Sequence, residues 1–175
     1  MKVCRCYNLY PGQYESRGLQ VEFRRVLEDG SMSVVNEVAV NAESTDTFQV
    51  VCRINHIGDL WKFSLISVVR LQGNTYMELA QMQNVDDTAT DTYRKPVLGS
   101  GVLGWTAVGE YTTNVRNSYV GVARQMSTIS CNDAVTYRCD VTYTTPATPA
   151  PGFQSQNGAN NKTLPVQGTC SSFFT

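Results

Sequence analysis

Apolar and polar residues alternate along several short segments, and this period-two pattern is typical of a half-buried β-strand. It runs through residues 48–54, 61–71 and 135–143. Gly73 and Asn74 interrupt the pattern as a turn, and residues 76–82 then resume an apolar run that suits a strand, although 77–82 also fits a short helix. No longer segment has helical periodicity, so the sequence predicts an all-β protein.

Two stretches depart from the strand pattern. Residues 97–109 hold four glycines, which favours turns or bulged edge strands, and we interpret the stretch as a long glycine-rich insertion. Residues 144–164 combine prolines and glycines with Thr, Gln and Asn, which predicts a long exposed loop before the last strand. Residues 1–30 are interpreted as an N-terminal extension or first strand, and residues 31–175 as one domain.

Composition narrows the class of protein. The chain has 175 residues, of which 42% are hydrophobic, enough for a packed core. Its formal net charge is −1 and its basic residues do not cluster, so we expect no nucleic-acid partner. No apolar run is long enough for a transmembrane segment. The first residues lack the apolar stretch of a signal peptide, and we expect Met1 to start a trimmed or rebuilt piece of a longer precursor.

Six cysteines, an even number, indicate an oxidising compartment, and buried cytosolic thiols are the alternative. The Cys4-Arg5-Cys6 spacing is too tight for a zinc knuckle, and we expect no metal and no cofactor. Asn161-Lys162-Thr163 is a glycosylation acceptor within a polar stretch. Together these features favour a secreted protein or one on the extracellular face of the cell surface.

Catalytic chemistry has few candidates. His56 is the only histidine, and a lone histidine in a loop is more often a surface residue than a catalytic base. Asp86, Asp87 and Asp91 form an acidic cluster, but it lacks the glycine and terminal glutamate of a calcium loop and is interpreted as a solvated loop. We therefore expect no catalytic residues and no enzyme.

A constellation of residues identifies a candidate family. Asp133, Tyr137 and Cys139 form an Asp-x-x-x-Tyr-x-Cys string at the start of an alternating segment. Further upstream, Cys52 lies inside another such segment, and Trp61 follows nine residues later. These residues resemble the immunoglobulin superfamily, specifically a variable-like domain, over about Phe48 to Tyr143. The resemblance implies an immunoglobulin-like sandwich of two antiparallel sheets.

The resemblance also assigns structural roles. It implies that Cys52 and Cys139 form a disulfide between the sheets, that Trp61 packs on it, and that Tyr137 closes a corner by hydrogen bonding to backbone. It implies that Asp133 pairs with an arginine, for which Arg94 or Arg116 is expected. The chain departs from the family in three ways: the two cysteines are further apart, Trp61 is closer to the first of them, and Arg124 occupies an apolar position.

A narrower similarity involves the segment from Cys52 to Ala80 and the residues from Tyr137 to Val141. Both resemble the immunoglobulin domains of molluscan fibrinogen-related haemolymph lectins. In those proteins the domains accompany a separate lectin domain, which this chain does not contain.

Once Cys52 and Cys139 are assigned, four cysteines remain. A bridge across Cys4-Arg5-Cys6 would be strained, so Cys4 and Cys6 are expected to reach Cys131 and Cys170, in one of two orders. The alternative is a free pair that links to another chain.

The segment after Tyr143 leaves its strand where a variable domain places its third complementarity-determining loop. Its aromatic and amide side chains suit a binding surface, and the candidate ligand contacts are Phe153, Gln154, Asn157 and Asn160. A glycosylated tether is the alternative, and Tyr111 and Tyr119 are secondary candidates.

These features predict a recognition or adhesion module that binds a protein or glycan ligand through its loops or a sheet face, in a setting such as invertebrate innate immunity. The alternative is a structural assembly unit that self-associates into a polymer through its cysteine-rich N-terminal arm and strand edges.

Overall fold

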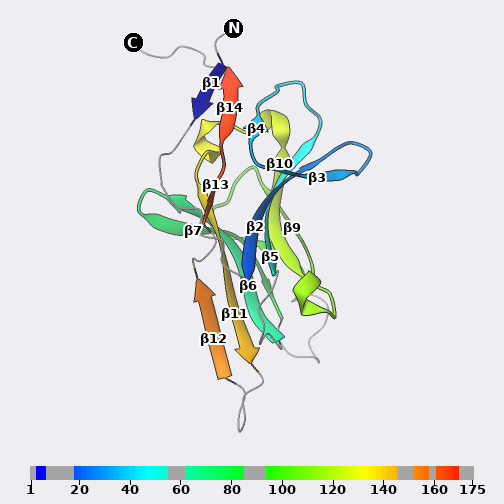
Figure 1. Ribbon diagram of the computed structural model, residues 1–175, viewed down its shortest axis with the longest axis vertical. Coiled ribbons are helices and arrows are strands. Elements are labelled where there is room, and N and C mark those ends of the chain that lie inside the picture. Colours follow the sequence, from blue (N-terminus) through cyan, green and yellow to red (C-terminus); the bar gives the residue numbers. More distant parts are fainter. Residues whose placement is uncertain are drawn as a thin grey trace.

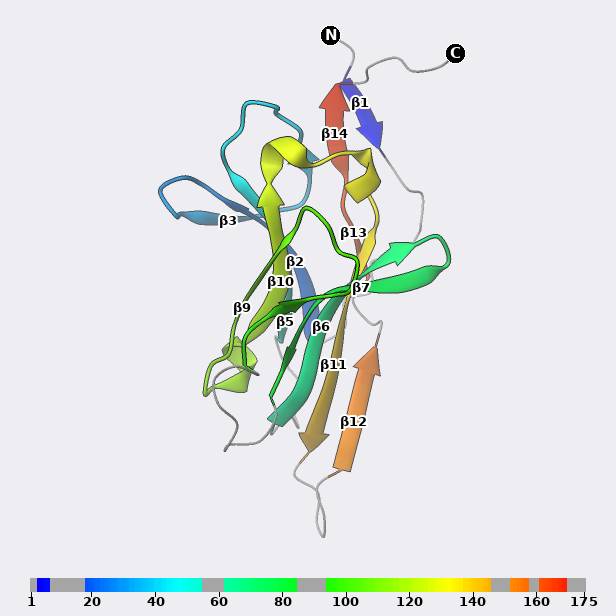
Figure 2. The same cartoon turned by 180° about the vertical axis from the view of Figure 1, so that it is seen from behind.

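The computed structural model describes residues 3–6, 18–54, 62–84, 94–145, 152–157 and 161–169. Within these ranges the chain forms strands and three short 3-10 turns, without any α-helix: η1 (Val115–Asn117), η2 (Met126–Thr128) and η3 (Cys131–Asp133). Two antiparallel sheets pack as a sandwich, and a small third sheet continues from one end (Figures 1 and 2). The all-β prediction is confirmed.

One layer is a five-stranded antiparallel sheet in the order β3-β2-β5-β10-β9. Its strands are β2 (Leu19–Val26), β3 (Met32–Val35), β5 (Thr47–Ile54), β9 (Thr106–Glu110) and β10 (Tyr119–Gln125). The period-two pattern explains the central strand β5, in which Phe48, Val50, Cys52 and Ile54 are fully buried against the other layer.

The other layer follows the order β12-β11-β6-β7-β8, and a short strand, β13, also pairs with β11. Its strands are β6 (Lys62–Gln72), β7 (Thr75–Gln83), β8 (Val97–Leu98), β11 (Thr136–Thr145), β12 (Gly152–Asn157) and β13 (Lys162–Thr163). β6 and β7 form a hairpin whose turn contains Gly73 at a φ of +61°. β7 is a strand throughout, so the alternative of a short helix at residues 77–82 is wrong.

The third sheet has the order β1-β14-β4. Its strands are β1 (Val3–Cys6), β4 (Val38–Ala39) and β14 (Val166–Thr169), with β14 antiparallel to β1 and parallel to β4. The region 1–30 thus contributes β1 to this sheet and β2 to the five-stranded sheet, where β2 pairs with β5 along its whole length.

The core lies between the two large sheets. Phe23 from β2 contacts Tyr137 from β11 edge to face, with ring centroids 5.7 Å apart, and also lies 6.0 Å from the ring of Phe48. All three side chains are fully buried. This aromatic contact joins the layers near the third sheet and fixes the end of the sandwich at which β11 begins.

The glycine-rich stretch forms sheet edges, because β8 ends one large sheet and β9 ends the other. Gly99 allows β8 to approach the β7 backbone closely: its N–H donates to the Leu79 carbonyl at 2.8 Å, and a Cβ there would lie 2.2 Å from the Glu78 carbonyl oxygen. Only glycine fits at this contact.

The interpretation of residues 144–164 as one long loop is wrong. The stretch contains β12, whose residues Gly152–Asn157 pair with Asp140–Thr145 of β11, and the short strand β13. Edge strands are held by backbone hydrogen bonds, so a polar segment with little apolar side-chain area can still complete a sheet.

Candidate functional site

The predicted disulfide clamp is present. Cys52 of β5 and Cys139 of β11 are bonded across the sandwich with their Cα atoms 5.3 Å apart, and both are fully buried. Each faces the core because it falls on the apolar phase of its strand. The bond therefore joins an inner strand of one layer to an inner strand of the other.

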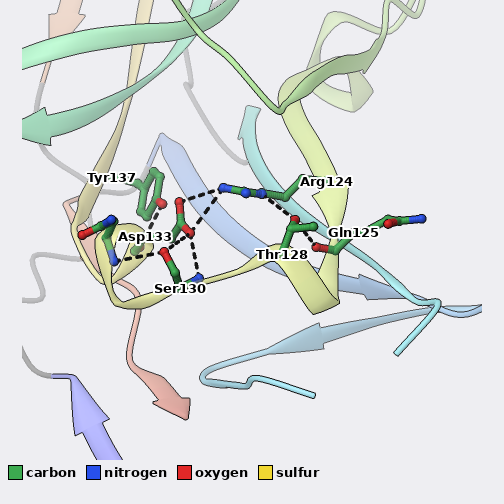
Figure 3. A network of polar contacts seen from close by, with 7 residues as sticks. Arg124, Gln125, Thr128, Ser130, Asp133 and Tyr137 are labelled. Atoms are coloured by element: carbon green, nitrogen blue, oxygen red, sulfur yellow. Dashed lines mark hydrogen bonds and ion pairs between the residues drawn. The ribbon is translucent and has the colours of Figure 1, made fainter. Parts of the chain in front are cut away.

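Tyr137 lies two residues before this cysteine, at the start of β11. Its hydroxyl donates to the carbonyl of Asp133 at 3.0 Å, which ties the beginning of the strand to η3 (Figure 3). The ring is fully buried, and burial raises the pKa of the hydroxyl far above its ordinary value, with the Asp133 carboxylate adding to the effect. Tyr137 is therefore a neutral donor at any physiological pH.

Asp133 pairs with Arg124, not with Arg94 or Arg116 as expected. Arg124 Nη1 lies 3.2 and 3.3 Å from the two carboxylate oxygens, and the Ser130 backbone N–H and hydroxyl donate to Oδ2 (Figure 3). The unusual arginine in β10 is thus explained, because it supplies the countercharge for a carboxylate whose side chain is 4% exposed.

The other structural candidates fall partly outside the described residues. Cys131 is disulfide-bonded, and its partner lies outside the side chains that the structure describes. Cys4 and Cys6 belong to β1, although their side chains are not described. Trp61 and Cys170 lie outside the described residues, as do His56 and the acidic cluster of Asp86, Asp87 and Asp91.

The candidate ligand contacts do not lie on one loop. Phe153, Gln154 and Asn157 belong to the edge strand β12, and Asn160 lies outside the described residues. The glycosylation candidate Asn161 is half-buried, and its Oδ1 accepts a hydrogen bond from the Tyr76 hydroxyl at 3.3 Å. Its Nδ2, which a glycan would occupy, has no hydrogen-bond partner among the described residues.

The secondary candidates have partners within the fold. Tyr111 packs against Phe63 with ring centroids 5.9 Å apart, and the Arg94 guanidinium lies 4.6 Å from its ring centre. Tyr119 lies on the outer face of the five-stranded sheet, with the Arg24 guanidinium 5.1 Å above its ring. Both rings are therefore occupied by intramolecular contacts.

On the outer face of the five-stranded sheet, the charged side chains pair with one another and cover the sheet. Arg24 donates to the Glu22 carboxylate at 2.6 and 2.9 Å while also covering Tyr119, and Arg53 approaches the same carboxylate at 3.9 Å. Beneath them Val51 is fully buried although it points away from the core. The charges on this face satisfy one another and leave little for a ligand.

The outer face of the six-stranded sheet differs because of a bulge in β7. Val68 pairs with Ala80, whereas the next residue, Val69, pairs with Glu78, so Leu79 is an extra residue in the ladder. Ala80 faces the core and is fully buried. The extra residue reverses the alternation and places Glu78 on the outer face, where Val69 of β6 lies between it and Arg138 of β11.

Glu78, Arg138 and Asp140 form a charged cluster on this outer face. Arg138 Nη2 donates to Asp140 Oδ2 at 2.8 Å, and its guanidinium lies 3.8 Å from the ring centre of Tyr76. Burial and the neighbouring Asp140 carboxylate raise the pKa of Glu78 above its ordinary value. The two carboxylates therefore repel one another, and Arg138 forms its ion pair with Asp140.

The cluster is not internally satisfied. Asp140 Oδ1 and Arg138 Nε are buried and have no hydrogen-bond partner among the described residues, although each side chain as a whole is 20% exposed. A buried polar atom without a partner costs about 1–3 kcal/mol, so such atoms call for an explanation. Together, the unsatisfied acceptor and donor distinguish this face from that of the opposite sheet.

The chain matches no known protein-family model, and no curated protein shows significant sequence similarity to it. The described residues contain no helix long and apolar enough to cross a membrane. Across the same residues, no three side chains from His, Cys, Asp and Glu are grouped to hold a metal ion.

The charged cluster was missed by sequence reasoning. Arg138 and Asp140 flank Cys139 on the polar phase of a strand, so alternation alone places them on one outer face. Glu78 carried no such signal, because the bulge that directs it outward depends on the pairing of β7 with β6 and β8. Only Arg138 and Asp140 could have been found from the sequence.

Proposed function

We propose that the chain is an extracellular recognition module that binds a protein or glycan ligand through the outer face of its six-stranded sheet. The observation that carries this proposal is the cluster of Glu78, Arg138 and Asp140, in which a buried acceptor and a buried donor lack partners among the described residues. The Arg138 and Asp140 side chains are each 20% exposed, so a ligand with hydrogen-bonding groups can reach the accessible part of the cluster. Such a role involves neither catalysis nor a cofactor.

The arrangement of strands supports a variable-type immunoglobulin domain as the scaffold. Such domains have strands A-B-E-D in one sheet and G-F-C-C′-C″ in the other. In the five-stranded sheet, the strands β2-β5-β10-β9 correspond to A-B-E-D. In the six-stranded sheet, the strands β12-β11-β6-β7-β8 correspond to G-F-C-C′-C″. This assignment follows chain order and reproduces both strand orders. The cysteines bonded between β5 and β11, and the Tyr137 bond to backbone four residues upstream, fit the same scaffold.

Cysteine usage supports an oxidising location. Cys52, Cys131 and Cys139 are all disulfide-bonded. Modules of this kind serve in cell adhesion and innate immunity, and we place this chain in that class.

The test is a binding screen with matched variants. The tetramerised chain is applied to an array of immobilised glycans and to a panel of purified extracellular proteins. The Glu78→Gln/Asp140→Asn variant removes both carboxylates while keeping side-chain shape, and we expect it to weaken binding of any ligand found by at least about tenfold.

Glu110→Gln is the control. Glu110 is an exposed carboxylate on β9, in the opposite sheet, so this variant should bind like the original chain. The proposal fails if neither screen yields a ligand, or if the control weakens binding as much as the double variant does.

A further inference from the structure

A hollow of about 460 Å³ lies at one end of the sandwich, apart from the charged cluster. The β6–β7 turn forms one wall, and η3 with the start of β11 forms the other. Polar and apolar surface contribute about equally to its lining, which is formed by Arg70, Leu71, Gln72, Gly73, Asn132, Val135 and Thr136. Pockets of roughly 300–1,000 Å³ accommodate small ligands, so the hollow is large enough for one or two sugar rings.

Arg70 gives this hollow a positive charge that the described residues do not neutralise. It lies opposite Tyr137 in the ladder between β6 and β11, and its side chain is half-buried. Asp133, the carboxylate near Tyr137, is already engaged by Arg124 through both oxygens and by two donors of Ser130. Among the described side chains, none forms an ion pair with Arg70.

Neutral hydrogen-bonding groups accompany this cation. Gln72 and Asn132 are exposed, and their side-chain amides have no hydrogen-bond partner among the described residues. Thr136 shares a hydrogen bond with Thr163 at 2.9 Å. The lining therefore offers one guanidinium and two amides that both donate and accept.

Both walls are held in place before any ligand arrives. Ser130 and Asp133 form a reciprocal cap on η3, and Tyr137 anchors the same turn. On the other wall, the Thr75 hydroxyl donates to the Gln72 carbonyl at 3.2 Å, and Gly73 adopts a left-handed conformation. A site with fixed walls loses little conformational entropy on binding.

We propose that this hollow binds a carboxylate-bearing sugar, such as a uronic acid. One guanidinium matches one carboxylate in charge and in its two-pronged hydrogen bonding. The amides of Gln72 and Asn132 suit hydroxyl groups, and Leu71 and Val135 contact the apolar face of a ring. A phosphate group, with its greater charge, would need further cations, and the described residues place no second Lys or Arg in the lining.

The site is tested by amide chemical-shift titration of the labelled chain with glucuronic acid, glucose, acetate and inorganic phosphate. We expect glucuronic acid to shift amides at residues 70–73 and 132–136, acetate to shift them more weakly, and glucose to leave them unchanged. Arg70→Gln should weaken glucuronic acid binding by at least about tenfold, whereas Arg53→Gln, on the outer face of the opposite sheet, should not.

Shifts confined to other residues, or no shifts at all, would overturn the proposal. The titration of the original chain decides whether the hollow binds the sugar, so the test holds even if Arg70→Gln does not fold. Acetate or phosphate binding as tightly as glucuronic acid would also overturn it, since the site would then hold any anion. The lining of the hollow shares no residue with the charged cluster, so either proposal can fail alone.

Discussion

Replacing Arg124 by methionine removes the cation beside Asp133 while keeping an unbranched apolar stem. The Asp133 side chain is 4% exposed and that of Arg124 is 19% exposed, so water can replace the lost charge only in part. Removing one partner of a buried ion pair costs about 3–5 kcal/mol. Because two donors of Ser130 remain on the carboxylate, we expect the lower end, a loss of about 3 kcal/mol in the free energy of unfolding.

The assay is equilibrium unfolding in denaturant with the disulfides intact. Arg53→Met is the control: its side chain is 44% exposed and 3.9 Å from Glu22, and such a pair contributes about 1 kcal/mol or less. In an Asp133→Asn background the Arg124→Met change should cost much less, because no buried charge is left behind. The reasoning is refuted if Arg124→Met costs no more than the control, or costs the same in both backgrounds.

Three further predictions concern single features. Tyr137→Phe should lower the free energy of unfolding by only about 1 kcal/mol, because the accepting carbonyl keeps a second backbone donor. The control is Tyr143→Phe: Tyr143 is half-buried and its hydroxyl has no hydrogen bond to a described residue, so the variant should change the free energy of unfolding by less than about 0.5 kcal/mol. Equal effects of the two variants would contradict the prediction. Cys52→Ala/Cys139→Ala opens a link between residues 87 apart and should cost about 4–5 kcal/mol by the chain-entropy relation, which a near-unchanged denaturation midpoint would disprove. Burial and a neighbouring carboxylate raise the pKa of Glu78 above 4.5 in the folded state, so the stability linked to its protonation is present below that value and lost as pH rises through the raised pKa. Glu78→Gln should therefore raise the free energy of unfolding at neutral pH, by less than about 1 kcal/mol because the group is partly solvated. In acid the variant should be as stable as the original chain. A stability difference that does not change with pH would count against burial and the Asp140 carboxylate as its cause.

Alternation of apolar and polar residues predicted the central strands well. β5 buries Phe48, Val50, Cys52 and Ile54 on one face, and β11 buries Tyr137, Cys139 and Val141 on one face. The period of two is therefore visible in both sequences, and the positions of Cys52 and Cys139 on the apolar phase follow directly. The disulfide between the layers was accessible for that reason. A strand that buries one face shows alternating apolar and polar residues in its sequence, as both of these strands do.

Features held by backbone or by long side chains left no such signal. β12 is joined to β11 through its ladder, which any residue except proline can complete, and its polar composition therefore suggested a loop. Arg124 reaches Asp133 across nine positions of sequence because a guanidinium extends far from its own backbone. The charge pairing of Asp133 could be anticipated, but the arginine that provides it could not.

The bulge at Leu79 gives β7 one residue more than its ladder with β6 needs. Deleting Leu79 would leave Ala80 opposite Val68 and Glu78 opposite Val69, so the ladder would become regular and neither residue would change face. The extra residue is nevertheless part of the core, because its side chain is fully buried. In a scan of deletions, loss of Leu79 should therefore act as a core truncation, costing about 2–5 kcal/mol, while the register of the sheet is kept.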